Sequence, residues 1–407
     1  MKRKRLFDEI GLINDTYIAE ADTVDRISSA KRVWVKWASV AAAACLMVVV
    51  VYLAIPHLKP VDPNYSSPNL PMLTISEDMG SFGFEGYLAY DIDELANGNP
   101  WVDDVSIRTL PVFWNTTVYD NAGRPISGLS ADAMIQKARD TAAILGLTAD
   151  SAYTNPTEEN MQREKDKMRS AGEEDYEPDT TPTSAVAICG DVRIEVHANG
   201  AIRIFFENGV ELPEELSFTQ YETTKEQAIE VTEFLLEQYK DVIGMTSPML
   251  ALFGDYTYEG QRSFTYIAYE GSGTPADQIL GYSFNQVKFS PNEEGELWII
   301  DLYTADLSQK IEDYPIIFAP EAQNELLNGH YITTVPEEFP GVEQIASVEL
   351  IYRTRRSDEV FMPYYRFLVE LPSMQRDNGL KTYGAYYVPA VESQYISNMP
   401  IWDGSFN

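Results

Sequence analysis

Three arginines, Arg353, Arg355 and Arg356, follow an apolar segment that is typical of a strand and stand in an acidic part of the chain. A guanidinium group donates paired hydrogen bonds to carboxylates and phosphates, so the chemistry that these residues offer is the binding of anions. We therefore predict a contact for an anionic wall polymer or an acidic partner. The alternative interpretation is a solvated hairpin tip that Asp358 and Glu359 neutralise.

The other residues that could do chemistry do not form a recognisable site. Short acidic groups stand at Asp91–Glu94, Asp103–Asp104 and Glu173–Asp175, but none has the spacing and the turn glycine of a calcium-binding loop. The chain has only 3 His and 2 Cys, too few for a typical zinc module. Cys189 ends an apolar segment, so we expect it in a core. We predict no metal, no cofactor and no catalytic residue, and a protein that is not an enzyme.

The elements that would position these residues can be predicted from apolar spacing. Residues 192–206 alternate between apolar and polar types around an Asn-Gly pair, which predicts a β-hairpin. A two-residue turn would put Val196 opposite Arg203, whereas a three-residue loop at Ala198–Gly200 puts Val196 opposite Ile202. We predict the three-residue loop with its glycine left-handed, because apolar residues then face each other. His197 falls on the polar face, where we expect a solvated strand residue.

Helix ends can be predicted in three places. One helix is predicted to begin after the N-cap residue Ser130 and to end at Gly146. A second helix begins with a capping box at Thr223–Glu226 and ends at Gly244. A third, short helix ends before Gly329. Each helix precedes or follows strands, which predicts an α+β fold with about three helix-plus-antiparallel-sheet units.

An uncharged run of 19 residues from Trp37 to Ile55 has the length of a membrane-crossing helix. Aromatic residues lie at both of its ends, and a cleaved signal peptide would have a shorter apolar core. We therefore predict one N-terminal transmembrane helix over residues 34–55. Basic residues concentrate before it, so the positive-inside rule predicts a cytoplasmic N-terminus and an extracellular C-terminal domain.

The predicted organisation of the chain follows from these elements. After the span comes a Pro-, Ser- and Asn-rich extracellular linker. The exported domain then divides into three α+β units, of which the first carries a charged insertion. The predicted segments are a cytoplasmic tail at 1–33, the span at 34–55, the linker at 56–72, and units at 73–220 (insertion 155–182), 221–310 and 311–407.

The tail carries an apolar stripe at helical spacing, which predicts a helix that binds in a groove of a partner. The alternative is a helix that packs on lipid headgroups. The stripe consists of Leu6, Phe7, Ile10, Ile13, Tyr17 and Ile18. Residues 6–21 resemble the N-terminal tails of single-pass regulators from Gram-positive, clostridial-type bacteria, some of them anti-sigma-factor-like. The tail lacks the His and Cys ligands of the zinc-binding anti-sigma domain.

Residues 314–390 carry a second resemblance, to the C-terminal region of YycI/YycH-type accessory proteins and to PepSY-like exported domains. The matching positions are Ala322, Leu326, Gly329, Tyr331, Val348, Leu350, Tyr352, Pro363, Tyr365, Arg366, Phe367, Tyr387, Val388 and Ala390. The resemblance implies a single-pass anchor and an exported regulatory domain that acts through a membrane sensor kinase. This chain departs from that pattern by a longer tail and an extra N-terminal unit.

The sequence thus predicts a membrane-anchored, non-enzymatic regulator or sensor that modulates a signalling partner, either a sensor kinase or a sigma factor. The alternative is an exported cell-wall-associated binding module or enzyme with a simple anchor. The formal net charge of −33 argues against a nucleic-acid partner, which would need a cationic face. The oligomeric state does not follow from the sequence.

Overall fold

The computed structural model describes residues 69–76, 85–103, 107–120, 123–221 and 223–404. The chain divides into a first unit, Met1–Asn69, and a second unit, Leu70–Asn407, and the second is the body described below. The predicted tail with its six apolar residues and the predicted span lie outside the described residues.

Strands dominate the described part of the chain, which holds seventeen strands and six α-helices. The helices are α3 (Ala131–Ile144), α4 (Glu158–Ser170), α5 (Lys225–Gln238), α6 (Lys240–Ile243), α7 (Pro275–Phe284) and α8 (Ala319–Leu327). The first nine strands are β1 (Gly86–Ala89), β2 (Thr109–Trp114), β3 (Ser151–Asn155), β4 (Ser184–Cys189), β5 (Val192–His197), β6 (Ile202–Val210), β7 (Pro248–Leu250), β8 (Phe253–Tyr256) and β9 (Arg262–Glu270). The other eight are β10 (Asn285–Pro291), β11 (Leu297–Thr304), β12 (Lys310–Pro315), β13 (Ile332–Thr333), β14 (Ile345–Tyr352), β15 (Val360–Phe361), β16 (Pro363–Glu370) and β17 (Lys381–Pro389).

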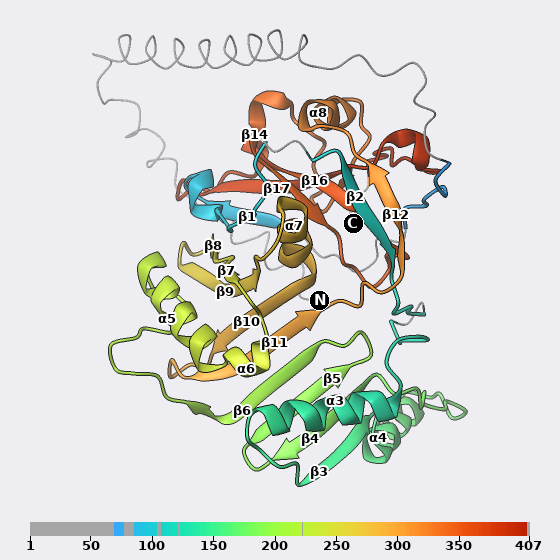
Figure 1. Ribbon diagram of the computed structural model, residues 1–407, viewed down its shortest axis with the longest axis vertical. Coiled ribbons are helices and arrows are strands. Elements are labelled where there is room, and N and C mark those ends of the chain that lie inside the picture. The colour runs from blue at the N-terminus through green and yellow to red at the C-terminus, as the bar shows by residue number, and fades with distance from the viewer. Residues whose placement is uncertain (1–68, 77–84, 104–106, 121–122, 222, 405–407) are drawn as a thin grey trace, which may run out of the picture. The chain divides into compact units, whose positions relative to one another are not determined.

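The strands form three antiparallel sheets (Figure 1). A nine-stranded sheet has the order β3-β4-β5-β6-β11-β10-β9-β7, with β8 paired to β9. A five-stranded sheet has the order β1-β17-β16-β14, with β13 paired to β17. A three-stranded sheet has the order β12-β2-β15.

The predicted fold of three helix-plus-sheet units is wrong, because the strands pair across the expected units. Strand β6 pairs with β11, β1 pairs with β17, and β2 pairs with both β12 and β15. Apolar periodicity shows which segments are strands, but it carries no information about partners that are far away in the chain. The result is a sheet-rich body with few helices.

The predicted localisation, a single-pass cell-membrane protein with an extracellular C-terminal domain, is also corrected. Across the part of the chain that the structure describes, no helix is both long enough and apolar enough to cross a membrane. The longest helices there, α3 and α5, have 14 residues each, whereas a span needs about 20 apolar residues.

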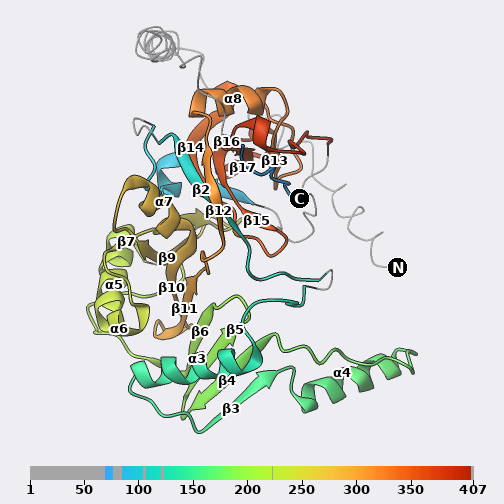
Figure 2. The same ribbon diagram turned by 45° about the vertical axis from the view of Figure 1, so that its right-hand side comes forward.

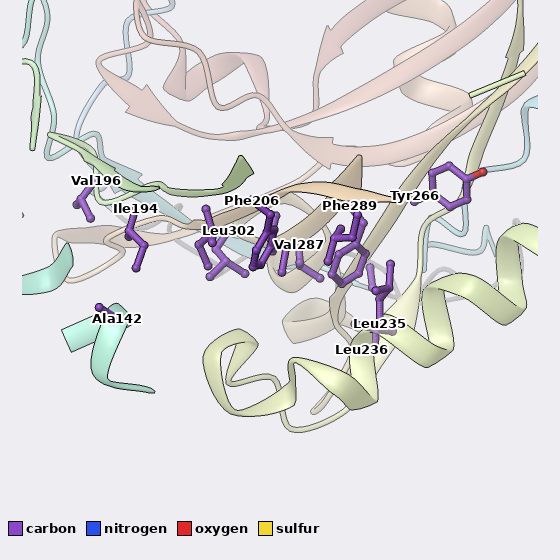
Figure 3. Packing of buried hydrophobic residues seen from close by; sticks show 14 of the residues in the cluster. Ala142, Ile194, Val196, Phe206, Leu235, Leu236, Tyr266, Val287, Phe289 and Leu302 are labelled. Carbon is purple, nitrogen blue, oxygen red and sulfur yellow. The ribbon is translucent and has the colours of Figure 1, made fainter. Parts of the chain in front are cut away.

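The largest core lies between the helices and one face of the nine-stranded sheet (Figure 3). Ile194 and Val196 of β5 point toward Ala142 of α3, while Phe289 of β10 lies near Leu235 of α5. Side chains alternate between the two faces of a strand, so this face is apolar and the residues between are polar. The opposite face is therefore free to carry charged side chains.

Several predictions of turns and helix ends agree with the structure, unlike the prediction of the fold. Val196 pairs with Ile202, and Gly200 has a φ of 83°, which confirms the three-residue loop. Ser130 caps α3 by accepting from Ala133 N at 3.3 Å, as predicted. The capping box of α5 lies one residue later than predicted, at Thr224 with Gln227.

Two segments of the structure differ from the sequence prediction. The sequence of residues 281–289 predicts one strand, but residues 281–284 are the last turn of α7, whose start has a capping box at Thr274 and Asp277. The charged insertion contains α4, which leads away from β3 and buries none of its residues (Figure 2). Pairs such as Arg163 with Glu159, at 2.9 Å, support this helix locally.

Candidate binding site

The candidate site is centred on Arg353, the residue that follows strand β14. Its side chain is buried, with 5% of the residue exposed. The guanidinium carbon lies 4.9 Å from the ring centre of Tyr364 and 5.4 Å from that of Tyr387. Guanidinium groups stack favourably on aromatic faces, so two strands, β16 and β17, hold this cation in place.

Helix α7 fixes the backbone just before this arginine. The Tyr352 N–H donates to Ser283 Oγ at 3.0 Å, and the Tyr352 hydroxyl donates to the Pro111 carbonyl at 2.8 Å. Both contacts are made by a tyrosine that is only 3% exposed. The end of β14, and with it the start of the Arg353 side chain, is therefore positioned by α7 and β2.

The carboxylate of Glu85, the residue immediately before β1, faces the same region. Tyr387 donates its hydroxyl to both Glu85 oxygens, at 2.8 and 2.6 Å, and Tyr87 donates to one of them. Arg366 Nη1 lies 3.7 Å from Glu85 Oε1. Burial raises the pKa of both tyrosines, and the nearby Glu85 raises it further. Both phenols therefore stay protonated and keep donating to Glu85 near neutral pH.

Arg366 of β16 forms a second ion pair, with Glu349 of the neighbouring strand β14. Burial acts to lower the pKa of Arg366, but Glu349 and the surrounding tyrosines raise it above its ordinary value. Removing one partner of such a pair would leave a buried charge uncompensated. Loss of either partner alone would therefore destabilise the sheet next to the cavity.

These residues border a cavity of about 510 Å³, which we call the arginine cavity. Its lining includes Glu85, Tyr87, Asp255, Arg353, Arg355 and Tyr387. Asp255 Oδ1 accepts from Leu88 N and Tyr256 N, each at 2.7 Å, and burial raises the pKa of its carboxyl group. The cavity has the size range of small-molecule sites, with a few fixed polar groups.

The structure separates the three arginines that the sequence groups together. Arg355 Nη2 donates to Asp358 Oδ1 at 2.9 Å, and both side chains are nearly buried. Arg356 is exposed and lies 5.3 Å from the ring centre of Tyr119, beside a different cavity. Asp358 thus neutralises Arg355, but both Asp358 and Arg353 are buried, so the segment is not the solvated tip of the alternative interpretation. Arg353, which also interacts with the charge of Asp358, stacks between rings in the arginine cavity.

Several other residues that the sequence analysis considered can be placed in the structure. Asp91 and Glu94 form a capping box on a short 3₁₀-helix at Ile92–Leu95. Cys189 is buried, as predicted, and burial raises the pKa of its thiol. His197 is half-buried on the outer face of β5. Within the described ranges, no three His, Cys, Asp or Glu residues converge as metal ligands.

Sequence reasoning missed most of the lining. Glu85, Tyr87 and Asp255 were not singled out, because each lies far from Arg353 in the chain. Tyr387 was named only among the positions that resemble YycI/YycH-type proteins, in a strand whose apolar and aromatic residues do not alternate with polar ones. Its partner Glu85 could be found only from the pairing of β1 with β17.

Comparison with known protein families found no family model that matches the chain, and comparison with curated proteins found none that matches it either. The resemblances to YycI/YycH-type, PepSY-like and anti-sigma-like proteins therefore remain predictions.

Proposed function

We propose that this protein is a non-enzymatic regulator that senses an anionic small molecule in the arginine cavity and passes its state to a signalling partner. The observation that carries the proposal is the position of Arg353, a buried cation that lines an open cavity and is stacked on two tyrosine rings. Planar guanidinium groups held in this way bind carboxylates and phosphates with defined geometry.

The two tyrosine hydroxyls of the arginine cavity favour binding over catalysis. Glu85 accepts hydrogen bonds from Tyr87 and Tyr387, and the raised pKa values of these phenols keep their protons in place. A general acid or base works best with a pKa near the working pH. This arrangement therefore supports a rigid recognition surface rather than a proton-transfer site.

A route from the cavity to the surface supports a sensor. Thr354 and Arg355 also line the arginine cavity, and Arg355 is paired with Asp358. The Asp358 carbonyl accepts from Asn115 Nδ2 at 2.9 Å, and the Glu359 carbonyl accepts from Asn115 N at 2.9 Å. An anion bound to Arg353 would thus act on residues 354–359, which are hydrogen-bonded to Asn115 at the end of β2. The partner classes that we propose are a sensor kinase or a sigma factor.

The double variant R353M/D358N tests ligand binding. It removes the buried cation together with the carboxylate beside it, and the amide oxygen of the asparagine can still accept the hydrogen bond of Arg355. Hydrogen bonds to charged groups contribute about 1.5–3 kcal/mol, so we expect citrate to bind the variant roughly ten- to a hundredfold more weakly than the wild type. Isothermal titration calorimetry on the full chain measures both affinities.

Arg356→Gln is the matched control, because it removes an arginine of the same cluster that does not line the arginine cavity. Citrate should bind R356Q as it binds the wild type. The binding proposal is wrong if neither citrate nor inorganic phosphate binds the wild type, or if R353M/D358N binds citrate equally well.

The signalling part needs a separate experiment in the protein's own cells. Crosslinking followed by mass spectrometry should recover a sensor kinase or a sigma factor with the wild type, and in a different amount with R353M/D358N. Recovery of neither class, or recovery in equal amounts from both proteins, would contradict the regulator. An enzyme would instead convert the anion, which product analysis of the citrate titration would show.

A further inference from the structure

A second cavity, of about 580 Å³, lies on the outer face of the nine-stranded sheet. Its floor consists of β4, β5, β6 and β11, on the face opposite to the core in Figure 3. Its lining includes Tyr119, Glu195, His197, Arg203, Asp301 and Tyr303. We call it the sheet cavity. Nothing in the proposed function uses it.

Polar side chains cross the floor of the sheet cavity in one row. Glu195 of β5 stands opposite Arg203 of β6, which stands opposite Asp301 of β11. Arg203 Nε donates to Asp301 Oδ1 at 2.5 Å. Ser184 Oγ donates to Glu195 Oε1 at 2.7 Å, and Asn155 Nδ2 donates to Ser184 Oγ at 3.2 Å. The row is thus preorganised by its own hydrogen bonds.

The charges of this lining cancel. Arg203 and Arg356 stand against Glu195 and Asp301. Burial lowers the pKa of His197 more than Glu195 raises it, so the imidazole is neutral near pH 7. A charged ligand would have to compete with an ion pair that already exists. A neutral ligand with many hydroxyl groups could bond to both partners of the pair at once, because each retains free donor or acceptor positions.

Two tyrosines complete the sheet cavity. Tyr119 and Tyr303 line it, and the Arg356 guanidinium carbon lies 5.3 Å from the ring centre of Tyr119. Burial raises the pKa of Tyr303 to about 12, so its phenol keeps its proton and remains amphipathic. The tyrosine rings and the planar carboxylate, amide and guanidinium groups that line the cavity together match a ring that has apolar C–H faces and hydroxyl edges.

We infer from this geometry that the sheet cavity is a binding site for a neutral saccharide. The inference rests on the cancelled charges, the hydrogen-bonded row and the two tyrosines. It is independent of the anion proposed for the arginine cavity.

The test is titration of the full chain with three neutral trisaccharides, maltotriose, cellotriose and tri-N-acetylchitotriose, and with the charged trigalacturonate. We expect at least one neutral probe to bind, and to bind more tightly than trigalacturonate. Asp301→Asn breaks the ion pair but keeps the shape, and Tyr303→Phe removes only a hydroxyl group. Each should weaken the neutral probe at least fivefold, as measured by calorimetry.

Two controls isolate the site. Tyr258→Phe changes an exposed tyrosine that does not line the cavity, and R353M/D358N changes the arginine cavity. Both should bind the neutral probe like the wild type. The inference fails if no neutral trisaccharide binds, if trigalacturonate binds most tightly, or if Y303F, whose fold is checked by thermal melting, binds like the wild type.

Discussion

Two opposing effects act on the pKa of the Asp358 carboxyl group: its burial and the nearby guanidinium groups of Arg353 and Arg355. Burial raises the pKa of its carboxyl group to about 6, and Arg353 acts against this rise. The ordinary pKa of an aspartate is about 3.9. The folded protein therefore binds a proton at this site more tightly than the unfolded chain does. This contribution to stability is present below about pH 4 and is lost as the pH rises through about 6.

Asp358→Asn should remove that pH dependence, because asparagine has a similar shape and does not titrate. The free energy of unfolding of the wild type, minus that of D358N, should fall by roughly 2 kcal/mol between pH 4 and pH 7. Urea denaturation of both proteins at several pH values measures the difference. If the arginines outweighed burial, the difference would instead rise over the same range.

The sequence could predict the arginine cluster but not the separate positions of its members. Arg353, Arg355 and Arg356 are neighbours in the chain, and nothing in their spacing shows which one is buried. Burial of Arg353 depends on the rings of Tyr364 and Tyr387, which belong to other strands. Pairing between distant strands therefore decides which arginine lines the arginine cavity.

Helix α7 is the element that connects two sheets, and the sequence prediction missed it. It contacts β9 and β10 of one sheet and β14 of the other. Its N-terminal signals, Thr274, Pro275 and Asp277, are typical of a helix start. The alternating residues that follow favoured a strand. The β5–β6 hairpin, in contrast, was predicted correctly because its register depends only on neighbouring residues.

Gly281 of α7 should not tolerate a side chain. A Cβ atom there would lie 1.8 Å from the Glu270 carbonyl oxygen of β9. Alanine normally stabilises a helix by about 1 kcal/mol relative to glycine, but at this position we expect Gly281→Ala to destabilise the protein by about 1–3 kcal/mol. Chemical denaturation measures the change.

Gln278→Ala in the same helix serves as the control and should change the free energy of unfolding by less than about 0.5 kcal/mol. Because Ser283 of α7 accepts from Tyr352 N, G281A should also weaken citrate binding at Arg353. A neutral or stabilising effect of G281A would show that α7 does not approach β9 this closely.

At the scale of the whole molecule, strands from both ends of the described region share sheets and cores. One core cluster contains Leu110, Ile279, Leu326 and Val388, which the sequence prediction assigned to different units. Local apolar patterns predict individual strands, such as those of the β5–β6 hairpin. They could not identify the partners, because pairing depends on which faces meet after the chain has folded.

Scanning calorimetry distinguishes one body from three units. Since the sheets and cores are shared, we expect residues 70–407 to unfold in a single transition, with equal calorimetric and van't Hoff enthalpies. Separable units would give two or more resolved transitions. Repeating the scan at several heating rates checks that the transition is reversible.

The pairing of β1 with β17 also constrains how the protein can be made. Glu85 and Tyr387, which bond across this pair, are 302 residues apart. A ribosome that adds about 5–20 residues per second needs roughly 15–60 s to cover that distance. During this time the early strand waits with its backbone groups unpaired, while β17, which takes a central place in the sheet, is synthesised near the end. Among the strands that the structure describes, the first to emerge is therefore one of the last to find its partner.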